Sequence, residues 1–345
     1  EVASNVPRLD YSDGGCPSLL LEPTRTNNLV QSNLFLSGWA ITGTGSSVGN
    51  SVSGAFPNLD GTSITLASGG LLYSSMTPIS SGVMSIYMRI PSGTVDVSLG
   101  DPQGSPFEVK TLTTTWQRFS TVDTGSLGGL AIYNNQSGTT ITIEVSAAQL
   151  EQGSYATSYI PTNGSAVTRS ADTATGAGNA STFNSSVNGN VLMVEISALN
   201  NDLTNRVISL SDGSLNNRLY LFFNTTSNTI TSLLRVGGSS QFSELSYVSQ
   251  DITSSNKIAY KLSSTEFSLW VNGIKVSYIS GNFNTWADGT INQLSFRDQS
   301  GGNPFYGNTK QLQYFDSALN DSDLEKITSW TSFTAMANAQ SYTII

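Results

Sequence analysis

The chain has 345 residues, of which only 11% are charged, and its formal net charge of −9 comes from 24 acidic and 15 basic residues. The basic residues are scattered singly, which excludes the basic surface that binding to nucleic acid or to an anionic membrane requires. With one cysteine, Cys16, and no histidine, the sequence excludes an intramolecular disulfide and a zinc site made of Cys and His.

The length predicts two domains with separate cores. Abundant Gly, Ser, Thr and Asn favour turns and exposed strand faces over helices. No apolar run is long enough to span a bilayer, so we expect no membrane insertion. Glu1 is not an initiator residue, and we expect the chain to be a processed or excised piece of a longer protein.

Residues 1–28 hold three prolines and one short strand candidate at 19–21, which predicts an ordered but irregular N-terminal arm. Residues 29–152 contain short alternating segments such as "VMSIYMRI" and "ITIEVSAAQLE", separated by Ser/Gly-rich turns. A spacing of roughly 8–12 residues between such turns is typical of a β-sandwich. We therefore predict a first jelly roll at 29–152.

Residues 153–182 are rich in small residues and lack periodicity, which predicts a linker before a second sandwich at 183–345. In "EFSLWVNGIKVSYIS", alternation breaks at Asn272-Gly273, and this dipeptide supplies the positive φ angles of a type I′ hairpin turn. Asn320 can cap the helix predicted for "DSDLEKITSW". The fold prediction is all-β: two antiparallel jelly-roll β-sandwiches in tandem, with one short helix near the C-terminus.

Two groups of motifs resemble known families. The order of "KIAYKLSSTEFSLWVNGIKV" and "FRDQSGGNPFYGNTKQLQYFDSALNDSDLEKITSW" resembles concanavalin A-like jelly rolls of the laminin G and pentraxin type. "VPRLDYSDGGCPSLLLEPTRTNNLVQSN" and "LEQGSYATSYIPTNGSAVTRSAD" resemble segments that flank a carbohydrate-binding-module-like jelly roll in bacteriophage virion and tail-fibre proteins. The second resemblance implies a phage structural or receptor-binding protein.

The residues give no sign of a catalytic site. Histidine is absent, and no strand carries the paired carboxylates that glycoside hydrolysis needs. The cluster of Asp321, Asp323 and Glu325 is explained by the favourable interaction of acidic residues with a helix N-terminus. We therefore predict no enzymatic activity.

Sugar recognition combines aromatic faces with amides and carboxylates, and one loop offers all of these. The candidate glycan contacts are Arg297, Asp298, Gln299, Asn303, Phe305 and Tyr306 in "RDQSGGNPFYGN", together with Trp286 in "GNFNTWADG". The competing interpretation, which we favour for the loop, is that Phe305 and Tyr306 fill the sandwich edge and that Asp298 caps a turn. For Trp286, a buried position in the core under the loop is as well supported by the sequence as an exposed glycan contact.

Calcium is the metal ion that oxygen-rich side chains favour. Asp298 and Asp316 are candidate ligands only through the family resemblance, and no cofactor is certain.

The leading hypothesis is a non-enzymatic tail fibre, tailspike or capsid-decorating fibre at the virion surface, which binds bacterial surface polysaccharide. We expect contacts with other virion proteins and a homo-oligomer, with a trimer favoured. One alternative is a purely structural virion protein, in which the candidate aromatic residues are all buried. Another is an accessory glycan-binding module of a larger phage depolymerase, or of a protein secreted by a bacterium or held at its cell surface.

Overall fold

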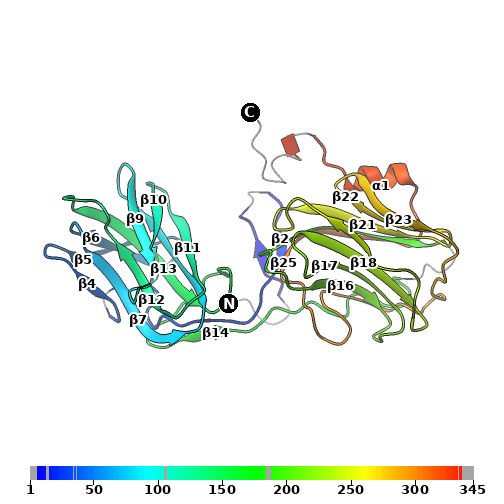
Figure 1. The fold of residues 1–345 in the computed structure, drawn as a ribbon, viewed down its shortest axis with the longest axis horizontal. Coiled ribbons are helices and arrows are strands. Elements are labelled where there is room, and N and C mark those ends of the chain that lie inside the picture. The colour runs from blue at the N-terminus through cyan, green and yellow to red at the C-terminus, as the bar shows by residue number, and fades with distance from the viewer. Residues whose placement is uncertain are drawn as a thin grey trace. The chain divides into compact units, whose positions relative to one another are not determined.

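The computed structural model describes residues 6–12, 15–33, 35, 37–104, 107–183, 188–332 and 334–335. The chain forms two compact units, which are unit 1 (residues 1–23 and 172–345) and unit 2 (residues 24–171) (Figure 1). Within the described ranges all strands pair antiparallel. A short α-helix of eight residues, α1 (Asp321–Thr328), follows the last strand. The all-β prediction is confirmed. None of the helical segments that the structure describes is long and apolar enough to cross a membrane.

Unit 1 is a sandwich of two antiparallel sheets. The seven-stranded sheet has the order β1 (Leu9–Asp10), β2 (Ser18–Leu21), β25 (Gly307–Phe315), β15 (Asn190–Ala198), β21 (Asn256–Leu262), β22 (Glu266–Val271) and β23 (Ile274–Ser280). The six-stranded sheet has the order β19 (Ser239–Ser240), β18 (Thr229–Val236), β17 (Arg218–Phe223), β16 (Arg206–Ser211) and β24 (Gln293–Ser295), with β20 (Leu245–Val248) also paired to β18.

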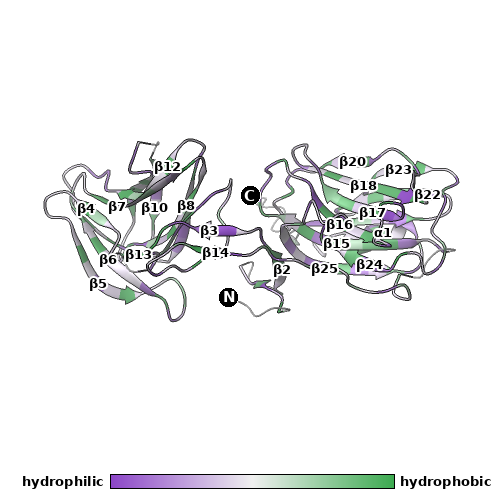
Figure 2. Cartoon of the chain, turned by 90° about the horizontal axis from the view of Figure 1, so that it is seen from below, coloured by the Kyte–Doolittle hydropathy of each residue, from purple (hydrophilic) through white to green (hydrophobic). Residues whose placement is uncertain are grey.

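Alternation along each strand builds the core of unit 1. On β17, Leu219, Leu221 and Phe223 enter the core that the two sheets share. Because successive side chains of a strand point to opposite faces, the residues between them lie on the outer face of the sheet. Figure 2 shows this as bands of differing hydropathy along single strands.

Unit 2 is a second sandwich, of two five-stranded antiparallel sheets. One has the order β10 (Glu108–Leu112), β9 (Val95–Gly100), β12 (Leu127–Tyr133), β7 (Leu71–Ile79) and β4 (Ala40–Thr42). The other has the order β11 (Gln117–Asp123), β8 (Gly82–Arg89), β13 (Ile141–Glu151), β6 (Asp60–Leu66) and β5 (Ser47–Ser53). Fully buried aliphatic residues such as Leu99 and Ile132 from the first sheet meet Ile64 and Ile86 from the second.

The Asn-Gly hairpin and the capped helix are confirmed. Asn272 and Gly273 have φ angles of 51° and 87°, as the turn between β22 and β23 requires. The Asn320 side chain accepts a hydrogen bond from the Asp323 backbone N–H, 2.9 Å away, at the start of α1. The helix places Leu324 against the outer face of the seven-stranded sheet, where Trp270 is buried in the same cluster.

The two units have different extents from the four segments that the sequence suggested at 1–28, 29–152, 153–182 and 183–345. Within the arm, Leu19 of β2 pairs with Thr309 of β25. Arg8 forms ion pairs with Glu22 at 2.5 Å and with Asp172 at 2.6 Å. The predicted arm therefore contributes β1 and β2 to the seven-stranded sheet of unit 1.

The predicted linker is similarly divided, because its first part is held within unit 2. There, β14 (Val167–Arg169) pairs with β3 (Arg25–Asn27). The buried Glu151 carboxylate accepts hydrogen bonds at 2.6 Å from both the backbone N–H and the hydroxyl of Thr157. Polar side chains and short strands hold this segment, and a hydrophobic pattern does not reveal such contacts.

Candidate functional site

The first part of the predicted loop of residues 297–308, up to residue 303, is closed by the Asp298 carboxylate. Its Oδ1 accepts hydrogen bonds from the Ser300 hydroxyl at 2.6 Å and the Gly302 backbone N–H at 2.8 Å, and its Oδ2 accepts one from Asn303 Nδ2 at 2.8 Å. Burial alone would raise the pKa of Asp298, but these hydrogen bonds outweigh it and hold that pKa below its usual value. Asp298 is thus the structural centre of the loop.

Two of the predicted contacts belong to the core, and this corrects their proposed role. Phe305 is 1% exposed and packs against Phe223 and Phe296. Trp286 is 6% exposed, and its Nε1 donates to the Arg235 backbone carbonyl at 3.0 Å. Neither ring presents a face to a ligand, because the apolar side chains of a sandwich interior surround both.

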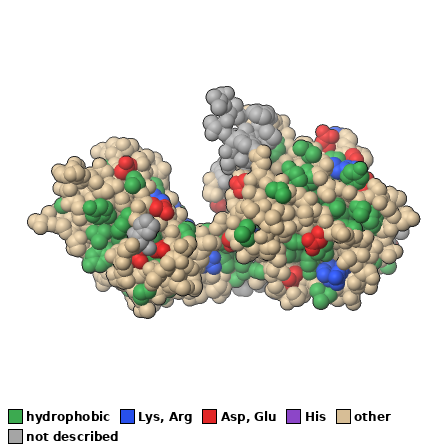
Figure 3. All heavy atoms as spheres, in the orientation of Figure 1, with side chains coloured by type: hydrophobic (Ala, Val, Ile, Leu, Met, Phe, Trp, Pro, Cys, Tyr) green, Lys and Arg blue, Asp and Glu red, His purple; other side chains and the backbone are tan. Residues whose placement is uncertain are grey.

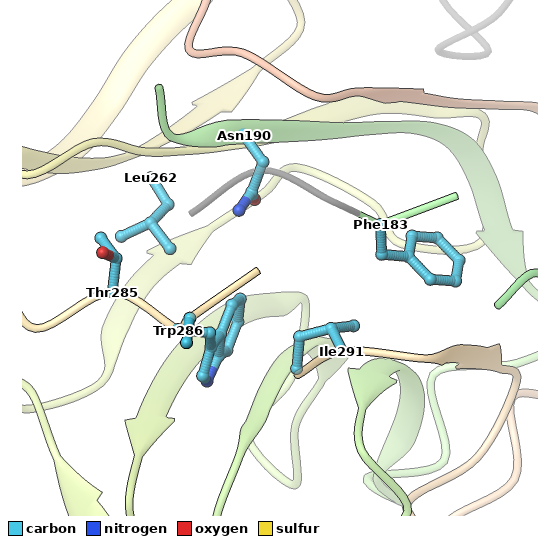
Figure 4. Close-up of a pocket in the computed structure, with 7 residues that line it drawn as sticks. Phe183, Asn190, Leu262, Thr285, Trp286 and Ile291 are labelled. Atoms are coloured by element: carbon cyan, nitrogen blue, oxygen red, sulfur yellow. The ribbon is translucent and has the colours of Figure 1, made fainter. Parts of the chain in front are cut away.

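Trp286 also lines a small cavity inside unit 1 (Figure 4). Its other labelled walls include Phe183, Leu262 and Ile291, with the Asn190 amide at one side. The volume is about 10 Å³, which is the space of a single water molecule. This cavity is too small for a sugar.

The four remaining predicted residues lie along the edge of the six-stranded sheet. Three of them accept hydrogen bonds from β16 through their backbone carbonyls. Ser209 Oγ donates to Arg297 at 2.6 Å, and the Val207 N–H donates to Asn303 at 3.0 Å. Arg206 Nε donates to Tyr306 at 3.1 Å. Gln299 Oε1 accepts a hydrogen bond from the Tyr220 hydroxyl. Asp298 and Gln299 are thereby brought to the outer face of this sheet.

On that face the structure places residues that were not predicted as site residues. Arg218 of β17 lies directly opposite Arg235 of β18, so that two positive side chains share one face. The Arg218 guanidinium lies 5.2 Å from the centre of the Tyr220 ring, and one of its nitrogens donates to the Leu215 carbonyl. We call the group Arg218, Tyr220, Arg235, Asp298 and Gln299 the arginine site.

Two buried donors of the arginine site have no hydrogen-bond partner. These are Arg218 Nε and Gln299 Nε2. Arg218 is 9% exposed, and in the described part of the chain no carboxylate oxygen lies within 4 Å of its guanidinium or that of Arg235. An unpaired donor in such a position is energetically costly, and it is satisfied when an acceptor from a ligand reaches it.

The electrostatics of the arginine site favour an anion. Burial lowers the pKa of Arg218, and repulsion from Arg235 lowers it further, while Tyr220 and Asp298 act in the opposite direction. Burial also raises the pKa of Tyr220, so its hydroxyl stays protonated and donates to Gln299. Like charges directly opposite each other destabilise a sheet, and an anion bound between them offsets this repulsion.

Charged side chains are sparse in this chain, in which 11% of the residues are charged. On the face drawn in Figure 3 they are scattered among uncharged side chains, both polar and apolar. Two neighbouring arginines without a carboxylate in contact are therefore a local concentration of positive charge in a chain of net charge −9.

The predicted calcium ligands do not form a ligand set. Both oxygens of Asp298 are engaged within its loop, and Asp316 is exposed just after β25. Among the residues that the structure describes, no three His, Cys, Asp or Glu side chains gather in a way that could hold a metal ion.

Comparisons with known proteins identify no family. No family model matches the chain, and no curated protein matches it. Several solved structures are similar at low identity. A carbohydrate-binding module, CBM40, of a Ruminococcus gnavus sialidase has 16% identity and a TM-score of 0.36, over 46% of this chain and 95% of its own.

Two other similar structures come from different contexts. A heptameric SAP-like pentraxin from Limulus polyphemus has 12% identity and a TM-score of 0.36, over 46% of this chain and 76% of its own. Domain 4 of AbnA, an extracellular arabinanase from Geobacillus stearothermophilus solved with arabinotriose, has 10% identity and a TM-score of 0.32, over 42% of this chain and 68% of its own. Similarities this distant carry no argument about function.

Proposed function

We propose that the chain is a non-enzymatic glycan-binding protein, and that the arginine site binds an acidic group of a bacterial surface polysaccharide. The observation that carries this proposal is the pair Arg218 and Arg235, opposite each other with an unpaired donor at Arg218 Nε. A guanidinium offers a planar fork of donors that matches the two oxygens of a carboxylate. The Gln299 amide nitrogen, the second buried donor without a partner, is proposed to donate to a sugar hydroxyl that reaches it.

The absence of catalysis is part of the proposal. A glycosidase needs two carboxyl groups on either side of the scissile bond. In the arginine site the one carboxylate, Asp298, has both oxygens engaged by its own loop. Its lowered pKa also keeps it ionised at neutral pH, which does not suit a general acid.

A place at the virion surface, as part of a fibre or tailspike, rests on the sequence resemblance of the two motifs that bracket unit 2. In the structure these two motifs are joined, because β3 of the first pairs with β14 of the second. We propose a homo-oligomer, with a trimer favoured, in contact with other virion proteins. A secreted or cell-surface location in a bacterium, or a role as a module of a depolymerase, is the alternative.

A purely structural role is the second candidate function. The observation that favours it is the burial of Phe305 and Trp286, two of the aromatic residues that a sugar contact would use. Under this alternative, Arg218 and Arg235 contact an acidic surface of another virion protein.

Binding to acidic polysaccharides tests the proposal directly. The probes are uronic-acid-containing bacterial polysaccharides, each beside its carboxyl-reduced form, which keeps the sugar units and loses the charge. We expect the full chain to bind at least one acidic polymer, to lose binding to its reduced form, and to bind more weakly as salt is added.

Substitutions identify the site. Arg235→Ala is expected to weaken binding at least about tenfold, the cost of losing a charge-assisted hydrogen bond. The matched control is Lys326→Ala, which removes an equal charge from a side chain that is 71% exposed on α1. If no acidic polymer binds, or if the two variants weaken binding equally, the glycan-binding proposal is rejected and the purely structural role remains.

A further inference from the structure

Unit 2 contains a polar cavity of about 240 Å³. Its walls come from three segments of the chain and consist of Gln31, Asn33, Asn58, Leu59, Asp60, Thr162 and Asn163. Six of these seven side chains are polar, and no lysine or arginine is among them. The cavity is thus large enough for a small ligand, and it is lined by groups that both donate and accept hydrogen bonds.

Three of the four side-chain amides at this cavity are not used to hold the fold; the fourth, Asn33, accepts a hydrogen bond from the Tyr159 hydroxyl. Within the described residues, the side chains of Gln31, Asn58 and Asn163 make no hydrogen bond, and neither does the Asp60 carboxylate. The contrast is with Asn134, whose Nδ2 donates to the carbonyls of Leu66, Ala67 and Thr139 at 2.8 to 3.0 Å.

Other amides of unit 2 follow the structural pattern. Asn27 Nδ2 donates to the carbonyls of Ala148 and Ile160, and Gln149 donates to Glu151. Amides that organise the backbone are therefore engaged, whereas those of Gln31, Asn58 and Asn163 at the cavity remain available.

The backbone that carries the available amides is fixed. Gln31 and Asn163 form an antiparallel bridge, and the Gly164 N–H donates to the Val30 carbonyl at 2.7 Å. The neighbouring Thr162 hydroxyl donates to the Leu29 carbonyl at 2.6 Å. A ligand thus meets a preformed wall, which reduces the entropy lost on binding.

The opposite wall is a turn with a fixed shape. The Leu59 carbonyl accepts a hydrogen bond from the Gly54 N–H at 2.8 Å. Asn58 lies within this turn at a φ of +62°, a left-handed conformation that Asn and Gly tolerate better than other residues.

An aromatic cluster stands beside the amides. Phe56 is 37% exposed and belongs to the same turn as Asn58. Its ring lies 5.0 Å from that of Tyr87 and 6.0 Å from that of Tyr159, to which it is nearly parallel at 8°. The Tyr159 hydroxyl donates to Asn33 Oδ1 in the cavity wall, so the cluster and the cavity are connected.

We propose that this cavity is a carbohydrate site of unit 2 that takes a neutral pyranose unit of a polysaccharide. Paired hydroxyls of a sugar match the donor and acceptor of each free amide. The exposed Phe56 ring, which is in the same turn as Asn58 but not in the cavity wall, would offer an apolar surface to a C–H face of the polysaccharide. A neutral sugar is favoured because Asp60 is the charged side chain in the wall, and it would repel an acidic one. The proposal does not rest on the arginine site.

The test uses the full chain and a panel of methyl glycosides and neutral homopolysaccharides of glucose, galactose and mannose. Binding is measured by saturation-transfer NMR and calorimetry. The variant Asn58→Gly with Asn163→Ala removes two free amides, and glycine preserves the left-handed turn. We expect its affinity to fall at least about tenfold, with an unchanged melting temperature.

Two control variants separate the alternatives. Asn50→Ala removes an exposed amide on β5, outside the cavity, and Arg235→Ala weakens the arginine site. Both are expected to bind the neutral probe as the unchanged chain does. The proposal is overturned if no probe of the panel binds, if the cavity variant keeps full affinity, or if Asn50→Ala loses as much.

Discussion

A single carboxylate decides the shape of the loop that contains most of the candidate glycan contacts. Three donors, from Ser300, Gly302 and Asn303, converge on Asp298. The competing interpretation of Asp298, as the residue that caps a turn, is the one that these contacts support. The loop is therefore shaped by its own hydrogen bonds before any ligand reaches it.

Replacing Asp298 tests this role through pH. Asp298→Asn keeps the size of the side chain but places an amide nitrogen opposite the Asn303 amide nitrogen, so that this hydrogen bond is lost. We expect the free energy of unfolding to fall by about 1–3 kcal/mol at about pH 7. The folded-state pKa is depressed, so the stabilisation exists above the ordinary Asp pKa and disappears as the pH falls through the folded value.

Thermal melts of the two proteins at about pH 7 and about pH 3 check the expectation. The difference in melting temperature should be largest near neutrality and should shrink at low pH. A difference that is equally large at both pH values would show that the Asp298 charge does not act in the way described.

The arginine site could not be predicted from the sequence, for a physical reason. Arg218 and Arg235 belong to "RLYLFF" and "TITSLLRV", which form β17 and β18, but their proximity depends on the register between those strands. Register is set by packing and turn geometry across the sheet, and one strand alone does not contain it. The local sequence does indicate which face each arginine occupies, because each alternates with core residues such as Leu219 on β17 and Leu234 on β18.

Elements with a strong local signal were predicted well. The hairpin at Asn272-Gly273 and the helix after Asn320 both depend on backbone requirements that particular residues satisfy. Short polar strands such as β3 and β14 were missed, because three residues are too few to establish an alternation.

The cap of α1 allows a prediction at the scale of an element. Asn320→Ala removes the acceptor for the Asp323 backbone N–H and should lower the stability of unit 1 by about 1 kcal/mol. Asn320→Ser retains a capping oxygen and serves as the matched control. Chemical denaturation of both variants measures the effect, and equal losses for Ala and Ser would argue against the cap.

At the scale of the whole molecule, the two sandwich cores were predictable and their chain boundaries were not. The cores follow from alternating apolar residues over long stretches. The boundaries depend on the ion pairs of Arg8 and on the pairing of β2 with β25, which join residues far apart in the sequence. Such contacts leave no periodic pattern in either partner.

Fragments provide the prediction for this scale. The Asp172 N–H donates to the Glu22 carbonyl at 2.9 Å, so the two ends of unit 1 meet where unit 2 departs. A chain in which residues 1–23 are joined to 172–345 through one or two glycines should therefore unfold in a single transition. Residues 172–345 alone should melt at a lower temperature, because β25 then has an unpaired edge.

The 24–171 fragment should fold by itself, since its core and its short β3–β14 sheet lie within that range. Circular dichroism melts of the three fragments check these expectations. Identical melting temperatures for 172–345 with and without residues 1–23 would contradict them.

The pairing of Ser18 with Asn308, through a 3.1 Å side-chain hydrogen bond across 290 residues, has a consequence for synthesis on the ribosome. Unit 2 is complete once residue 171 has emerged, whereas β2 cannot pair until its partner strand β25 has been synthesised. When unit 2 folds first, the pairing of β3 with β14 draws residues 25 and 169 together. The effective loop that closes when β2 pairs with β25 is then much shorter, and β2 stays tethered close to the rest of unit 1 while that unit is synthesised.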